Sequence, residues 1–193
     1  LFLASYCHIV LPHHLKRHRK HEENRGAFPI GTTKKGIGTC YADKISRTGM
    51  QFADFIHPER FRKKLHEIQG VDAERVYEAY LPAAERLKDY AAPVEEMLFA
   101  AQKRGEKILF EWAQGALLDI TFGTYPFVTS SCTLAGGVCS GLGVGPTKID
   151  KVVGVAKAYT TRVGNGPFPT ELLEEEKKLF PDHTEAREIG VTT

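Results

Sequence analysis

Apolar residues recur at helical spacing through most of the first half of the chain. Residues 7–23 begin with apolar side chains and then become strongly basic, which predicts one helix with Pro12 near its start, where proline is tolerated. Residues 58–105 have apolar positions three or four residues apart, which predicts several further helices. Pro93 is expected to open the last of these, and Gly105 to end it.

The pattern changes after residue 106. KILFEWAQG (residues 107–115) is a short apolar run broken by glycine, typical of a buried strand that leads into a functional loop, and VVGVAKAYTTRVG (152–164) is a second such run. Between them, residues 121–146 are rich in Gly, Thr and Ser, which favours loops and short helices over strands. ELLEEEKKLF (171–180) predicts a short acidic helix.

These elements predict an α/β fold in which a helical subdomain is followed by part of a central β-sheet with loops and short helices. We expect a mainly helical subdomain over residues 1–105 and the sheet domain over residues 106–193. The first contains a Gly/Thr-rich loop, residues 31–49, which is expected to lead into a short helix over residues 41–47.

Charge is unevenly spread along a chain of 193 residues whose formal net charge is only +2. Residues 1–50 hold nine Lys/Arg against three Asp/Glu, whereas residues 171–193 hold seven acids against three bases. The basic quarter suits an anionic ligand or an acidic partner, although two differently solvated faces would have the same composition. Residues 13–20 lack interleaved aromatic residues, so we expect no nucleic acid as a partner.

The cysteines form no metal-binding or disulfide pattern. Cys7, Cys40, Cys132 and Cys139 include no CxxC pair, which indicates free thiols in a reducing compartment and a cytoplasmic location. The longest apolar runs fall short of a membrane span, so we expect no membrane association.

The stretch GTTKKGIGTCYADKISRTG, residues 31–49, contributes few large apolar side chains. Its glycines allow positive φ and close approach to a ligand, and its backbone N–H groups, hydroxyls and basic side chains suit a phosphate. The sequence GxxxxGK[ST] of a Walker A loop does not occur. A mobile surface loop is the alternative interpretation.

Two further stretches carry candidate chemistry. In residues 110–137, Glu111 and Asp119 are candidates for a carboxylate pair in acid–base catalysis, though Glu111 is equally well explained as a structural carboxylate. Gln114 lies just past the expected strand, where a side chain can point into a cleft, and the Thr129–Ser131 run is either a binding turn or an ordinary capping cluster. TTRVGNGPFPTE, residues 160–171, is either the wall of a site or a rigid connector.

Histidines are concentrated in the first expected helix. His14, His18 and His21 share one helical face, but basic neighbours would repel a cation. A solvated basic helix is therefore the favoured interpretation, and we expect no metal ligand in this chain.

Five blocks, in this order and at these distances, together resemble the adenylosuccinate synthetase family over essentially the whole chain. They are GTTKKGIGTCYADKISRTG, ILFEWAQGALLDITFGTYPFVTSS, AGG followed by GLGVGPTKID, KAYTTRVGNGPFPTEL and EIGVTT. The resemblance implies a GTP-dependent, Mg²⁺-requiring ligase that joins IMP and L-aspartate in AMP biosynthesis, with an α/β fold. It also implies a homodimer in which each site is completed by the neighbouring subunit.

The resemblance assigns roles to several residues. Thr33, Gln114 and Thr129 are expected to bind IMP, and Arg47 to reach the IMP phosphate of the neighbouring subunit. The run Val191, Thr192 and Thr193 matches the beginning of the family's aspartate-binding loop. Trp112 and Cys132 depart from the family pattern, in which a small residue and an asparagine are expected at these positions.

The family's phosphate loop, with its catalytic aspartate and Mg²⁺ ligand, is not found in this sequence, nor are the catalytic histidine and the guanine-recognising segment. We therefore expect an internal fragment with no catalytic residue of its own and no turnover alone. The alternative is a non-catalytic module for binding a purine nucleotide or for dimerisation.

Overall fold

The computed structural model describes residues 1–177 and 188–191, and it confirms the α/β class. The chain divides into two compact units, each treated by itself below. Unit 1 comprises residues 1–20 and 34–111, and unit 2 comprises residues 21–33 and 112–193. These units are defined by contacts within the chain, and the functional division near residue 105 stays a prediction.

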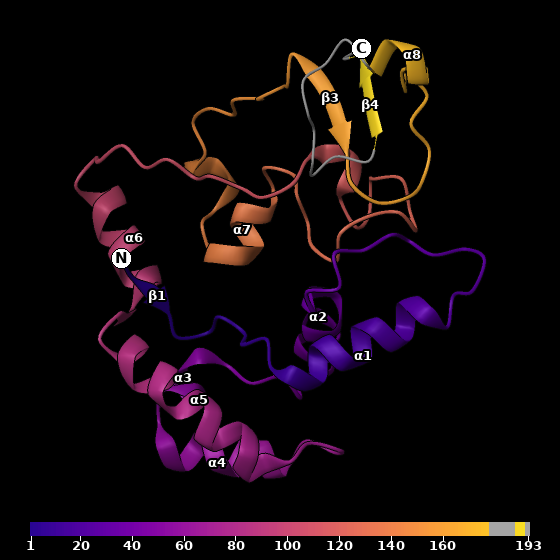
Figure 1. Ribbon diagram of the computed structural model, residues 1–193. Helices are drawn as coiled ribbons and strands as arrows, with labels where there is room; N and C mark the ends of the chain where they lie inside the picture. Colours follow the sequence, from indigo (N-terminus) through magenta and orange to yellow (C-terminus); the bar gives the residue numbers. More distant parts are fainter. Residues whose placement is uncertain (178–187, 192–193) are drawn as a thin grey trace. The chain divides into compact units, whose positions relative to one another are not determined.

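Helices dominate unit 1 (Figure 1). Two-residue strands β1 and β2 pair in parallel, with Leu3 opposite Ala91. In chain order the elements are β1 (Leu3–Ala4), α1 (Pro12–Glu23, whose last turn passes into unit 2), α2 (Ile37–Ser46), α3 (Phe52–Phe55), α4 (Pro58–His66), α5 (Ala73–Lys88), β2 (Ala91–Ala92) and α6 (Val94–Lys103).

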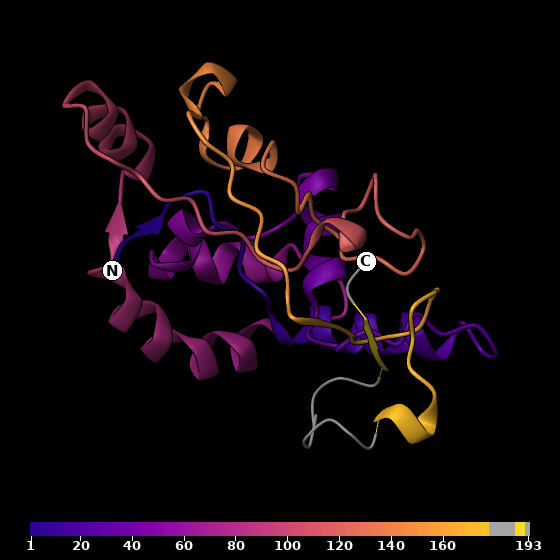
Figure 2. The same ribbon diagram turned by 90° about the horizontal axis from the view of Figure 1, so that it is seen from above.

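The core of unit 1 lies where α3, α4 and α5 meet. Phe61 and Leu65, four residues apart on α4, are fully buried, and the Phe61 ring contacts Phe55 edge-on at 4.9 Å between centroids. α4 and α5 lie side by side in both ribbon views (Figures 1 and 2). The Asp72 carboxylate caps the N-terminus of α5 by accepting the Arg75 N–H. This local hydrogen bond helps to fix where the turn after α4 ends and α5 begins.

Unit 2 is mostly loops around short elements, which agrees with the loops and short helices predicted for residues 121–146. Strands β3 and β4 pair antiparallel, with Thr161 opposite Ile189. The elements are η1 (Ala116–Leu118), α7 (Gly137–Leu142), η2 (Pro146–Lys148), β3 (Tyr159–Arg162), α8 (Glu174–Lys177) and β4 (Glu188–Val191).

Both strand predictions need correction. Residues 107–111 are not a strand, and in residues 152–164 only Tyr159–Arg162 forms one. A strand requires hydrogen bonds from a neighbour, and no strand pairs with residues 107–111 or 151–158 in the described part of the chain. Several of their apolar side chains are consequently exposed, Leu109 at 89% and Val155 at 94%.

Two helix boundaries also differ from expectation. The first helix begins at Pro12 rather than near residue 7, because residues 3–9 pair with other segments, His8 forming a bridge to Gln51. α2 begins at Ile37, directly after Gly36 with φ 80°. The predicted acidic helix is present as α8, and residues 178–180 of that prediction lie outside the described residues.

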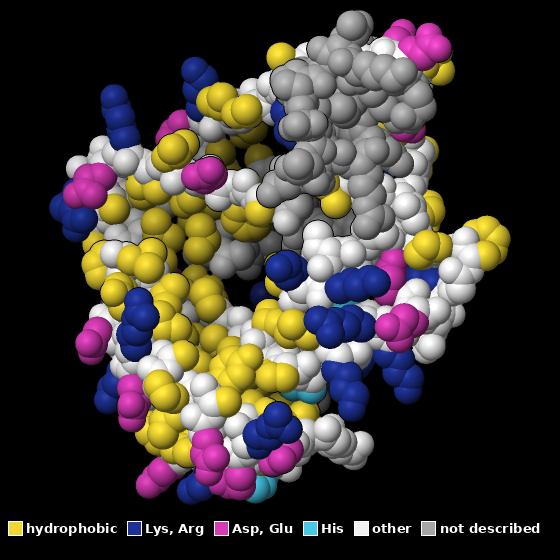
Figure 3. Space-filling view, in the orientation of Figure 1, with side chains coloured by type: hydrophobic (Ala, Val, Ile, Leu, Met, Phe, Trp, Pro, Cys, Tyr) yellow, Lys and Arg dark blue, Asp and Glu magenta, His cyan; other side chains and the backbone are white. Residues whose placement is uncertain are grey.

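Lys and Arg side chains gather over α1 in the space-filling view (Figure 3).

The helices within residues 1–177 are all too short or too polar to cross a bilayer.

Candidate functional site

The loop that carries Thr33 is held by a buried carboxylate. Glu22, in the last turn of α1, is 7% exposed. Its carboxylate accepts the Gly31 N–H at 2.6 Å and the Thr32 hydroxyl at 3.3 Å. A carboxylate makes stronger hydrogen bonds than a neutral acceptor, so Glu22 fixes the backbone immediately before Thr33.

The other side of this loop is held by Asn165. The Asn165 backbone N–H donates to the Ile30 carbonyl and its side-chain amide donates to the Pro29 carbonyl, both at 2.8 Å. The approach is so close that a Cβ on Gly31 would lie 2.8 Å from the Asn165 nitrogen, and Gly31 has φ 76°. The GTT block therefore needs glycine here for both conformation and space.

Asp119 organises the turn between Gln114 and Thr133. Its side chain is buried, and one carboxylate oxygen accepts the N–H groups of Thr121 and Phe122 at 2.9 and 3.0 Å. The other accepts the Thr133 N–H at 2.7 Å. These backbone donors, with Phe122 first, lower the pKa of Asp119 to about 2. Asp119 is thus a structural carboxylate that is ionised near neutral pH and does not suit proton transfer there.

Gln114 stands out by its backbone. Its φ is 66°, in the left-handed region that non-glycine residues rarely adopt, and its side chain is exposed. The next turn connects it to Thr129, since the Leu118 N–H donates to the Gly115 carbonyl and the Thr129 N–H donates to the Leu118 carbonyl, both at 2.9 Å.

Arg162, at the end of β3, joins the two remaining loops. Its Nη2 donates to the Phe127 carbonyl at 2.9 Å and to the Thr124 hydroxyl and Asn165 carbonyl at 3.1 Å. The two hydrogens of this one nitrogen are shared among the three acceptors, which therefore lie close together around it. Arg162 therefore ties the loop before Thr129 to the loop that holds Gly31.

The predicted IMP residues consequently fall into two groups. Thr33, Gln114 and Thr129 all lie in unit 2, on loops joined by the hydrogen bonds above. Arg47 lies in unit 1, at the C-terminal end of α2, with φ 65° and an exposed side chain. Val191 ends β4, and the other two predicted aspartate-loop residues, 192 and 193, lie outside the described residues.

Trp112 and Cys132 contact one another. The indole N–H donates to the Cys132 carbonyl at 2.6 Å. The ring lies against α7, where a Cβ on Gly137 or Gly141 would approach it to 3.1 Å. The bulky residue is therefore accommodated by two glycines on one face of α7.

Two histidines of the face predicted to be solvated, His14 and His18, bind protein groups, whereas His21 is exposed. The buried His14 ring hydrogen bonds to Asp43, and the His18 Nδ1 accepts the Gly36 N–H at 3.0 Å. His13, His14 and Asp43 bring one donor atom each within 4.8 Å of one another. This donor set does not fit Mg²⁺, which prefers oxygen ligands throughout.

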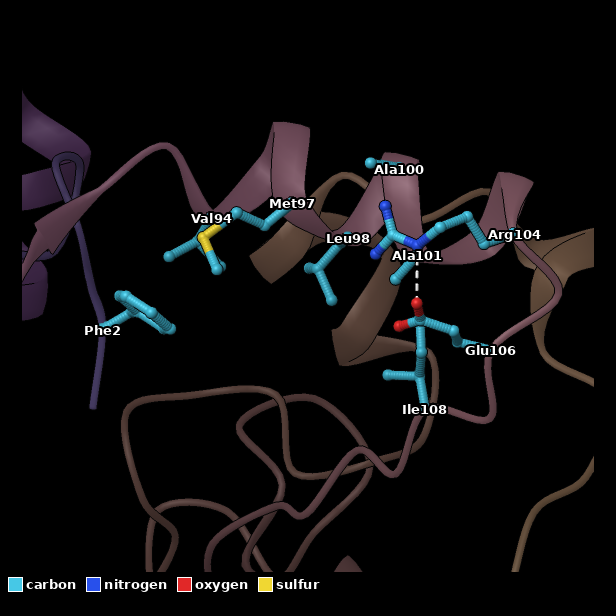
Figure 4. A pocket seen from close by; sticks show the side chains of 9 residues that line it. All are labelled: Phe2, Val94, Met97, Leu98, Ala100, Ala101, Arg104, Glu106 and Ile108. Carbon is cyan, nitrogen blue, oxygen red and sulfur yellow. Dashed lines mark hydrogen bonds and ion pairs between the residues drawn. The ribbon is translucent and has the colours of Figure 1, made fainter.

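An apolar hollow of about 550 Å³ lies against α6 in unit 1 (Figure 4). Its charged groups, Arg104 and Glu106, are engaged with each other. A nucleotide site needs polar groups that converge on the ligand, so this hollow is a poor candidate. It is lined by Phe2, Val94, Met97, Leu98, Ala100, Ala101, Arg104, Glu106 and Ile108.

Sequence reasoning missed the residues that hold the loops. The sequence predicts no function for Glu22, Asn165 or Arg162. It makes Asp119 a candidate for acid–base catalysis, whereas the structure shows that Asp119 holds a turn. A signal existed for Asn165, a side chain with both donor and acceptor between two glycines. Nothing local distinguishes Glu22 from its neighbour Glu23, because only the fold decides which of them is buried.

The family model of adenylosuccinate synthetase matches residues 1–193. The chain belongs to the adenylosuccinate synthetase family. Among its relatives, the adenylosuccinate synthetase of Heliobacterium modesticaldum is 46% identical and that of Caldanaerobacter subterraneus 47% identical. Both comparisons cover all of this chain and 48% of the relative.

A solved structure of the family shares the fold. The fully ligated adenylosuccinate synthetase of Plasmodium falciparum matches with a TM-score of 0.86 at 36% identity, over 99% of this chain and 50% of that one. The chain thus spans about half the length of the relatives that it matches.

Proposed function

We propose that the full-length protein containing this chain is an adenylosuccinate synthetase. In the reaction, the γ-phosphoryl group of GTP passes to the 6-oxygen of IMP, releasing GDP. The amine of L-aspartate then attacks C6 and expels phosphate, which leaves adenylosuccinate. Family membership supports a carbon–nitrogen ligase of purine biosynthesis in the cytoplasm.

The chain supplies part of the IMP site in this proposal. A carboxamide both donates and accepts hydrogen bonds, so Gln114 suits the base edge of a purine. The hydroxyls of Thr33 and Thr129 suit ribose or phosphate oxygens. A strained left-handed residue costs on the order of 1–3 kcal/mol, and such residues cluster at functional sites. The observation that carries the proposal is therefore the backbone of Gln114, φ 66°, in a loop fixed through Asp119.

Arg47 is proposed to bind the IMP phosphate in the site of a neighbouring subunit. Its side chain is exposed and its guanidinium suits bidentate recognition of phosphate. A homodimer is therefore part of the proposal. In mixed dimers, Arg47→Leu subunits should regain activity from a site-dead partner that retains Arg47, and no regain would remove this role.

GTP and Mg²⁺ are proposed to bind mainly through parts of the protein beyond these residues. When bound, the metal would supply charge stabilisation to the phosphoryl group. The side chains of this chain are proposed to bind and orient IMP, and none is assigned to a metal.

The test is an assay of adenylosuccinate formation from IMP, L-aspartate and GTP. The full-length protein should form product only when all three substrates are present, and the isolated 193-residue chain should form none. A folded full-length protein that binds IMP without turnover would instead support the non-catalytic module.

Within the full-length protein, Thr33→Ala and Gln114→Ala should each raise the KM for IMP about tenfold, corresponding to about 1.4 kcal/mol, with less effect on GTP. Larger effects on GTP would mean that these residues line a different part of the site.

A further inference from the structure

Helices α1 and α2 are joined by a partly buried polar cluster around Asp43. One oxygen of the Asp43 carboxylate is 3.0 Å from His14 Nε2, and the other accepts from Arg17 at 2.6 Å. Arg17 also donates to the Thr39 carbonyl at 2.7 Å. His14 is 1% exposed and the Asp43 side chain 16%. Two donors from α1 therefore hold a single carboxylate on α2.

The backbone fixes the direction of the His14–Asp43 bond. The Leu11 N–H donates to His14 Nδ1 at 2.8 Å, so Nδ1 carries a lone pair and the neutral ring has its proton on Nε2. His14 is thus a donor to Asp43. Burial lowers the pKa of His14, which agrees with a neutral ring.

The same geometry argues against a metal in this cluster. His13, His14 and Asp43 could offer three donor atoms, but Nε2 of His14 holds a proton and has no free lone pair. Its other nitrogen, Nδ1, accepts the Leu11 N–H. The cluster is therefore a structural hydrogen-bond network.

Asp43 also controls the end of α2 through its backbone. Its carbonyl accepts the N–H groups of Thr48 and Gly49 at 3.0 and 3.1 Å, and these bonds close the turn around Arg47. Arg47 itself has the left-handed conformation, φ 65°, that such helix ends use. The direction in which Arg47 leaves the helix thus depends on the residue that His14 and Arg17 hold.

We propose that Asp43, held by His14 and Arg17, is a positioning residue that orients Arg47 toward the IMP phosphate. The inference rests on the proposed function, in which Arg47 binds that phosphate. It assigns to α1 a part in substrate binding that acts through Arg47, since His14 and Arg17 hold Asp43 by hydrogen bonds. A phosphate contact is sensitive to such support, since small displacements of a binding group cost large factors in rate or affinity.

The test uses Asp43→Asn in the full-length protein. Asparagine keeps one acceptor oxygen but turns an NH₂ group toward either His14 or Arg17, each of which is itself a donor. The KM for IMP should rise about tenfold while kcat changes less than about threefold, because binding that is equal in the ground and transition states is lost. Asp89→Asn, an exposed carboxylate in the same unit, is the matched control and should change neither.

Two further variants separate positioning from general stability. The double variant Asp43→Asn/Arg47→Leu should be no weaker toward IMP than Arg47→Leu alone, because Asp43 acts through Arg47. His14→Gln, which can still donate to Asp43, should retain more IMP affinity than His14→Phe.

Hydrogen exchange gives a readout that does not depend on activity. In Asp43→Asn, the Thr48 and Gly49 amides should exchange about tenfold faster than in the parent protein. The positioning role would be overturned if the two substitutions raised the KM for IMP by the product of their separate factors. It would also be overturned if the amides exchanged faster in Asp43→Asn while the KM for IMP stayed unchanged. Either result can occur in an enzyme that still forms adenylosuccinate. A wild-type protein that forms no adenylosuccinate would overturn the proposed function itself.

Discussion

Replacing Glu22 with glutamine is expected to loosen the loop that carries Thr33. The carboxylate is buried and accepts from the Gly31 N–H at 2.6 Å and from Thr32. Glutamine has nearly the same shape, so the change removes the charge and one acceptor while creating no large cavity. The substitution therefore isolates the electrostatic contribution of this side chain.

The magnitude follows from the two hydrogen bonds. A bond to a charged group contributes about 1.5–3 kcal/mol and a neutral one about 0.5–1.5 kcal/mol. The remaining oxygen of glutamine can still accept the Gly31 N–H, so we expect a loss of about 1.5 kcal/mol at that bond. This corresponds to about a tenfold change in the equilibrium for local opening.

Amide hydrogen exchange of the 193-residue chain measures this opening directly. The Gly31 amide should exchange about tenfold faster in Glu22→Gln. Glu23→Gln is the matched control, because Glu23 is adjacent in sequence but exposed. Unchanged Gly31 exchange in Glu22→Gln, or an equal increase in both variants, would refute the assignment of Glu22 as the support of this loop.

Three further predictions concern stability, the Asp119 turn and the unpaired segments. Burial, foremost, lowers the pKa of His13 from 6.5 to about 4, so the unfolded chain binds more protons than the folded chain between these pH values. In urea unfolding, the free energy of unfolding should fall by about 1–2 kcal/mol more between pH 6.5 and pH 4 in the parent protein than in His13→Gln, which keeps the pH dependence due to other groups such as His14. Asp119→Asn turns an NH₂ group toward backbone donors, so titration calorimetry of the full-length protein should show about tenfold weaker IMP binding, with the exposed Asp150→Asn as an unchanged control. The amides of residues 108–110 should be protected from hydrogen exchange in the full-length protein but not in the 193-residue chain, because we expect strands from elsewhere in the protein to pair with these residues. Equal exchange of these amides in the two proteins would contradict this prediction.

Local patterns predicted α4 and α5 well because each of these helices buries one face of a regular period within unit 1. The strand predicted at residues 107–111 was wrong for this chain, since a strand depends on a partner that local sequence does not encode. Thr33, Gln114 and Thr129 could be predicted as site residues because several sequence blocks, in their order and spacing, resemble those of the family. Their supports, such as Glu22 and Arg162, became visible only when distant loops were placed side by side.

Asp43 illustrates the same limit from the other direction. In sequence it is one acid in a basic stretch, and its partners His14 and Arg17 lie 29 and 26 residues away. No periodic pattern connects residues at such separations. The histidines of α1 were interpreted as a solvated face because the sequence does not show which residues pack against that face.

The most direct test of the central claim is titration calorimetry of IMP into the full-length protein and three single variants, Thr33→Ala, Gln114→Ala and Thr129→Ala. If the loops of unit 2 form the IMP site, each variant should bind IMP about tenfold more weakly than the parent protein while its thermal unfolding is unchanged. Parent-like affinity in all three variants would contradict the account.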